Sequence, residues 1–109
     1  MSILISAMSS TPRDFTDAEN AAIDAHSVSL SQGNWIEHLD EVFFPAKPEN
    51  REDLDAVELD HALGEFASYH AGKTGLSDHI KWHLALAEQL RTLIATGLAH
   101  GCDRVGIAG

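Results

Sequence analysis

The 109-residue sequence has little basic charge, one cysteine and no long apolar run. Lys and Arg number 7 against 17 Asp and Glu, so the net charge is -10 with histidine neutral. Nucleic acids and anionic membranes attract clustered basic side chains, and we therefore expect neither as a partner. The single cysteine, Cys102, excludes an internal disulfide and predicts a reducing, cytoplasmic location. No apolar stretch approaches the ~20 residues of a membrane-spanning helix.

The patterns typical of an enzyme are missing as well. The sequence has no glycine-rich phosphate loop and no Ser, His and Asp in the order of a hydrolase triad. Cys102 lies in a glycine-rich tail that we expect to be flexible, which makes it a poor nucleophile. We therefore predict a binding protein and no enzyme. What the chain has in excess is histidine, with 7 residues, as many as Lys and Arg together.

Apolar residues recur with helical spacing over most of the chain. This spacing predicts three helices, or four if a break at Gly33 is complete, over residues 17–32, 35–44, 51–71 and 78–99. Thr16 and Glu19 form a capping box before the first helix, and Ser77 is the expected N-cap of the last. No strand alternation stands out. We therefore expect an all-α fold, a small antiparallel helical bundle around a buried metal site.

The two ends of the chain lack this periodicity. Residues 1–14 show no clear apolar pattern, and the last ten residues include several glycines. We expect a mobile arm over 1–14, a single helical-bundle domain over 15–99 and a flexible tail over 100–109. A bundle of three long helices leaves one side thinly covered, and we therefore expect a homodimer.

Four histidines fall on helix faces that we predict to be buried: His26, His61, His79 and His83. His79 and His83 are four residues apart, and His61 and Glu65 repeat this spacing, so each pair shares one helix face. A buried imidazole needs a partner, either a backbone carbonyl or water, or a metal ion that several rings share. These five nitrogen and oxygen donors without a thiolate favour iron, manganese or zinc.

The order of these motifs resembles the hemerythrin family of non-haem di-iron, oxygen-binding four-helix bundles. His26 is similar to that family's first-helix histidine. The His-x3-Glu motif at 61–65 looks like its second-helix motif, and the His-x3-His motif at 79–83 looks like its third. The resemblance covers roughly residues 15–90. It implies a non-haem iron protein that binds or senses oxygen or handles iron, with O2 as a ligand.

The same resemblance implies a role for each candidate ligand. His26, His79 and His83 would serve one iron ion. His61 would hold the other, and Glu65 would bridge the two. The family's fourth helix carries further ligands, so either a partner subunit supplies that wall or the site holds one metal ion.

A second resemblance is to chemoreceptor zinc-binding domains, which are small helical regulators. Residues 22–26 are similar to their first-helix segment. Residues 61–66 are similar to their Cys-x-Leu-Gly-x-Trp motif, with His in place of Cys, and His79 and His83 match their last motif. This resemblance implies a regulatory or signalling domain in which four histidines hold one zinc ion. A metal-free helical interaction domain with buried neutral histidines is the third alternative.

Overall fold

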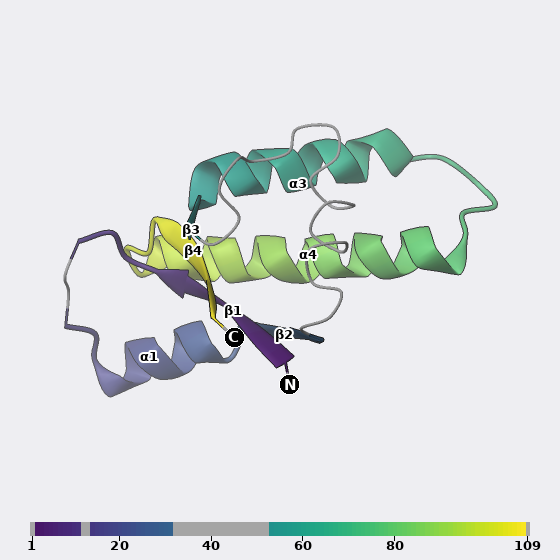
Figure 1. The fold of residues 1–109 in the computed structure, drawn as a ribbon. Helices are drawn as coiled ribbons and strands as arrows, with labels where there is room; N and C mark the ends of the chain where they lie inside the picture. The colour runs from purple at the N-terminus through teal and green to yellow at the C-terminus, as the bar shows by residue number, and fades with distance from the viewer. Residues whose placement is uncertain (1, 12–13, 32–52, 109) are drawn as a thin grey trace.

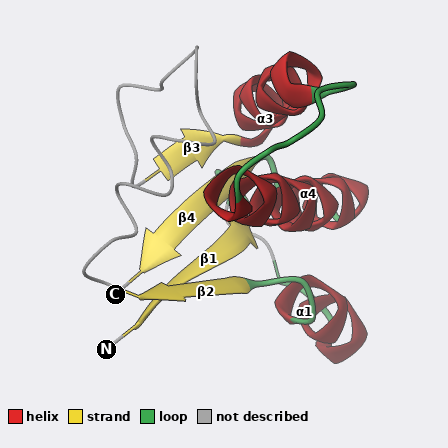
Figure 2. Ribbon diagram, turned by 90° about the vertical axis from the view of Figure 1, so that its right-hand side faces the viewer, coloured by secondary structure: helices red, strands yellow, loops and turns green. Residues whose placement is uncertain are grey.

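The computed structural model describes residues 2–11, 14–31 and 53–108. In chain order the elements are β1 (Ser2–Met8), α1 (Asp17–Asp24), β2 (Val28–Ser31), β3 (Asp53–Asp55), α3 (Ala56–His70), α4 (Asp78–Ala99) and β4 (Arg104–Ala108). The strands form one antiparallel sheet in the order β2-β1-β4-β3. Helices α3, α4 and α1 lie on one face of this sheet, with α4 between the other two (Figures 1 and 2).

The predicted all-α bundle is therefore wrong, and the two chain ends are the main reason. The expected mobile arm, residues 1–14, contains β1, and the expected flexible tail, residues 100–109, contains β4. The two strands pair with each other, with Ile5 opposite Ile107, and form the centre of the sheet. Each strand obtains its hydrogen-bond partners from the far end of the chain, so neither segment's own sequence reports the pairing.

The first predicted helix, over 17–32, is also wrong in its second half. α1 begins after the Thr16 capping box, as expected, but it ends after 8 residues, and the chain then forms β2. Leu30 is buried on β2 and Ser29 is exposed. This two-residue alternation is that of a strand. A four-residue strand is too short to distinguish from a helical stripe that shares its apolar residues.

The last predicted helix is confirmed, because α4 spans Asp78–Ala99 with Ser77 as its N-cap. The third is shorter than the predicted 51–71. Its start is delayed because β3 precedes it, and the carboxylate of Asp55 then caps α3 by accepting a hydrogen bond from a first-turn N–H. The predicted helix over 35–44 lies outside the described residues. Among the described residues, no helix combines the length and apolar character that crossing a membrane requires.

One apolar core lies between the sheet and the helices. Its buried side chains come from every strand and from both long helices, and include Ile5, Val28, Leu54, Leu63, Leu90, Leu93, Ile94 and Val105. Removing such side chains from water is the main favourable term in folding, at about 25 cal/mol per Å². Helix α4 comes close to β1 at Gly97, where an added Cβ would lie 2.6 Å from the Cβ of Ala7.

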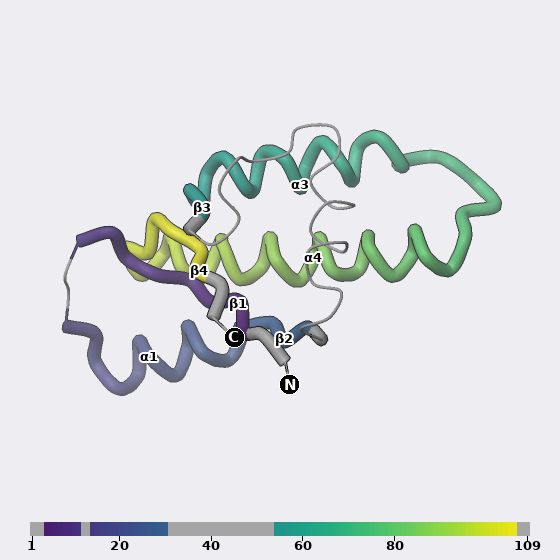
Figure 3. The backbone as a smooth tube through the Cα atoms, in the orientation of Figure 1, coloured from purple at the N-terminus to yellow at the C-terminus, as the bar shows by residue number. Residues whose placement is uncertain are grey.

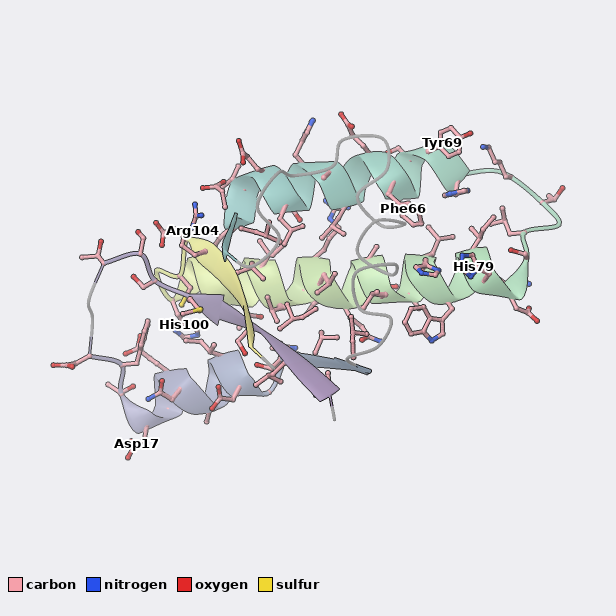
Figure 4. The ribbon with its side chains drawn as sticks, in the orientation of Figure 1. Asp17, Phe66, Tyr69, His79, His100 and Arg104 are labelled. Carbon is pink, nitrogen blue, oxygen red and sulfur yellow. The ribbon has the colours of Figure 1, made fainter. Side chains whose placement is uncertain are left out.

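Helices α3 and α4 form an antiparallel hairpin that extends past the strands. Figures 1 and 3 show the strands beside the start of α3 and the end of α4, and the connecting turn at the opposite end. We call residues 66–83, which include this turn, the distal end of the hairpin. Figure 4 places Phe66, Tyr69 and His79 there.

Candidate metal-binding site

The five predicted ligands lie on three separate parts of the molecule. His26 follows α1, His61 and Glu65 lie on α3, and His79 and His83 lie in the first two turns of α4. Of the four histidines predicted to be buried, His83 is confirmed, with 1% of its surface exposed, and the other three are exposed. Within the described residues, no three His, Cys, Asp or Glu side chains are grouped so as to hold a metal ion.

The incorrect burial predictions have local causes. Because α1 ends at Asp24, His26 does not continue its apolar stripe. On α3, His61 is exposed, and so is Val57 one turn earlier on the same side of the helix. The buried face of α3 is instead formed by Ala56, Leu59, Ala62, Leu63 and Phe66. A helix with apolar residues on two sides does not reveal which side its neighbours will cover.

His61 and Glu65 contact each other as their spacing predicts. Nε2 of His61 lies 2.9 Å from Oε1 of Glu65, and the side chains are 74% and 41% exposed. Water competes with such an exposed pair, so its contribution to folding is small. The pair faces solvent on α3 and stands apart from the histidines of α4. Its role as a metal ligand remains a prediction.

His79 and His83 are close together and partly ordered by the helix backbone. Nδ1 of His83 lies 2.7 Å from the carbonyl oxygen of His79. A carbonyl only accepts hydrogen bonds, so Nδ1 carries the proton, and the lone pair of the neutral ring is on Nε2. A hydrogen bond from the other ring nitrogen is the usual support of a metal-binding histidine. The two ring centroids are 4.4 Å apart.

The sequence interpretation missed a further histidine at the distal end. His70 is the last residue of α3, and its ring packs edge-on against those of Phe66 and Tyr69, with centroids 4.9 and 5.0 Å away. Nδ1 of His70 is buried and has no hydrogen-bond partner among the described residues. A buried polar atom without a partner is unusual in folded proteins and calls for an explanation, such as an ion or water. In the sequence, the one signal for His70 is that it lies four residues after Phe66 and therefore shares its helix face.

Two hollows border the outer face of α4. The first lies between α3 and α4, where Asp60 accepts a hydrogen bond from Arg91 at 3.0 Å. The second lies between α4 and the turn that contains His26. Glu88 and Thr92 line both hollows, so they form the ridge between them. The arrangement offers a contact surface with one ion pair and small side chains.

The described residues thus offer two kinds of site: a group of imidazoles and aromatic rings at the distal end, and a shallow contact surface along α4. Neither has a counterpart that would identify it. Comparison of the chain with protein-family models, curated proteins and solved structures found no match.

Proposed function

We propose that this protein binds a divalent transition-metal ion of the zinc class at the distal end, with His79 and His83 as ligands. The observation that carries the proposal is the hydrogen bond from Nδ1 of His83 to the carbonyl of His79. It holds the buried ring in one orientation and puts its lone pair on Nε2. His79 is exposed one turn earlier, and an exposed side chain changes rotamer within picoseconds to nanoseconds.

The donor atoms favour zinc over the other candidates. Imidazole suits zinc, copper, nickel and iron, and zinc imposes the weakest geometric demand on its ligands. The iron and oxygen predictions depended on a four-helix bundle with ligands on several walls. The described residues form a sheet with helices on one face instead, which leaves those predictions without their structural reason. Iron and O2 binding remain predictions that an absorption spectrum in air would test.

We propose a regulatory role for the ion, in line with the second of the two resemblances. A ligand that binds the folded state stabilises it by RT ln(1 + [L]/Kd), and here the gain would be local to the distal end. In Figure 1 this end lies farthest from the strands, so contacts between the two helices are its main support. An ion held there would order the hairpin end and control any partner that recognises it.

The test is a calorimetric titration of chelator-treated full-length protein with zinc chloride. We expect His79→Ala to weaken zinc binding at least about 10-fold. Removing a residue that only supports a metal ligand already weakens metal binding by about 10-fold or more, and His79 is proposed as a ligand itself. His26→Ala and His61→Ala remove histidines that are also exposed, and both should bind as the wild type does. An equal loss in His61→Ala would instead favour the ligand set predicted from sequence. No zinc binding by the wild type would contradict the proposal.

A protein-interaction role is the second candidate, and the two hollows along α4 favour it. The homodimer expected from sequence would use this face, where Glu88 lines both hollows. Sedimentation velocity at high micromolar concentration tests it. A dimer that Glu88→Arg converts to monomer would support the assignment. A wild-type monomer would contradict it.

A further inference from the structure

The buried nitrogen of His70 lies in the same part of the hairpin as the two proposed ligands. The packing register of α3 against α4 shows this. The hydrogen bond from Arg91 to Asp60 sets this register, because it places Arg91 of α4 near the level of Asp60 of α3. The helices are antiparallel, so moving ten residues along α3 from Asp60 to His70 corresponds to moving about ten residues back along α4. His70 therefore lies at about the level of the turn of α4 between His79 and His83.

Aromatic rings contact two of these three histidines. Phe66 and Tyr69 pack against the ring of His70, and Trp82 packs edge-on against His83 with centroids 5.0 Å apart. Phe66 is buried. In Figure 4, Phe66 and His79 lie at the same end of the hairpin, on α3 and α4 respectively. Tyr69 and Trp82 are 53% and 46% exposed, so the group lies where the apolar core meets solvent, and an ion could reach it from outside.

We infer that His70 is a third ligand, so that the zinc-class ion is held by Nδ1 of His70, Nε2 of His83 and the imidazole of His79. This inference rests on the proposed function and extends it. It explains why Nδ1 of His70 is buried without a partner among the described residues. It also uses none of His26, His61 and Glu65. As the side chains lie, the described residues do not form a completed coordination group. Binding must therefore bring together the ring of His70 on α3 and the adjacent rings of His79 and His83 on α4.

Three imidazole ligands leave the fourth position of a tetrahedral zinc ion open. Water or a side chain of another protein would take this position. Because His70 precedes the turn at 71–77 and His79 and His83 follow it, the ion would connect the two helices across that turn. Metal binding would then order the distal end in a way that a pair of ligands on α4 alone would not.

The experiment measures zinc affinity by competition with a chromophoric chelator, using full-length wild type, His70→Ala and His26→Ala. We expect His70→Ala to bind zinc about 10- to 100-fold more weakly, which is the loss of metal affinity typical when a group that supports a metal ligand is removed. His26→Ala should match the wild type, because His26 is exposed and lies on a different element. Circular dichroism without zinc shows whether His70→Ala keeps its helices.

A second measurement on the wild type avoids any folding defect in the variant. Long-range proton–nitrogen spectra of the imidazoles report which ring nitrogen binds the metal. One equivalent of zinc chloride should shift Nδ1 of His70 and Nε2 of His83 and leave His61 unchanged. If His79 and His83 respond and His70 does not, the inference is overturned and the proposed function stands. If no imidazole responds, both are overturned.

Discussion

At the end of the α3–α4 hairpin that lies on the sheet, Leu90, Leu93 and Ile94 are buried in one apolar cluster with Ile5 and Val105 from the strands. The distal end is built from imidazole and aromatic rings on two helices. Its rings belong to Phe66, Tyr69, His70, His79, Trp82 and His83. Apolar packing against a sheet needs no ligand, whereas a buried imidazole nitrogen without a partner would gain from one. The comparison therefore contrasts an end held together by apolar packing with an end that carries the proposed metal ligands.

The largest expected effect on stability is at the end of the α3–α4 hairpin that lies on the sheet. Ile94→Ala should lower the free energy of unfolding by about 2–5 kcal/mol, because it removes a fully buried side chain and leaves a cavity. Leu98→Ala is the matched control, since Leu98 lies one turn later on the same helix and is 44% exposed. Urea unfolding followed by circular dichroism measures both. Equal losses would show that the core does not lie where the buried residues place it.

The second prediction concerns the distal end. Zinc at 100 times its Kd should stabilise the folded protein by about 2.7 kcal/mol, if the unfolded chain does not bind it. Because the proposed ligands are all at the distal end, hydrogen exchange should slow most at amides near His70 and His83. Amides that open only on global unfolding, such as those of β1 and β4, would slow by no more than the global gain. Protection confined to the neighbourhood of His61 would contradict the distal site.

Two helical glycines compare a place where a helix packs on the sheet with one where a helix faces only the neighbouring helix. Gly97→Ala should destabilise the protein by about 1–3 kcal/mol, because its Cβ would meet the Cβ of Ala7 at 2.6 Å and helix and strand would have to move apart. Gly64→Ala on α3 is the control. Its Cβ would meet only the Arg91 side chain at 3.7 Å, so helix propensity should dominate and stabilise by up to about 1 kcal/mol. Thermal unfolding of the two variants should therefore shift in opposite directions.

The smallest expected effect is at the exposed junction between β1 and β4. The backbone N–H and the hydroxyl of Ser10 donate to the Asp103 carboxylate at 2.8 and 2.5 Å. These two hydrogen bonds hold the pKa of Asp103 below its ordinary value of 3.8, and the bond from the hydroxyl has the larger effect. A carboxyl whose pKa is lowered by folding adds stability above its unfolded pKa, and this stability disappears as the pH falls through the folded pKa.

Asp103→Asn tests this contact through the pH dependence of the melting temperature. The wild type should melt slightly higher at neutral pH, and the difference should shrink as the pH falls below about 3.8 and through the lowered pKa of the folded state. Asp14→Asn is the control, because Asp14 is also exposed and lies outside the described helices and strands, so its substitution should change the melting temperature little. A difference that grows in acid would contradict the assignment.

Much of the local structure could be predicted from sequence, and the layer arrangement could not. The Thr16 capping box and the Ser77 cap depend on residues within one turn, and both are confirmed. The sheet depends on pairing between the chain ends, which no window of neighbouring residues contains. The candidate site shows the same division. The contact between His79 and His83 follows from their spacing of four, whereas the burial of the Nδ1 atom of His70 depends on how α3 and its neighbours pack.

By itself, the sequence determined the acidic charge, the extent of α4 and the i, i+4 pairs on α3 and α4, because these depend on composition or on contacts within one or two turns. Only the tertiary structure decided that the helices cover a sheet and which histidines are buried. Burial is set by the neighbours that cover a face, and those neighbours come from distant parts of the chain. For that reason His83 is buried, whereas the side chain of His61, at a similar place in its own helical pattern, is exposed to water.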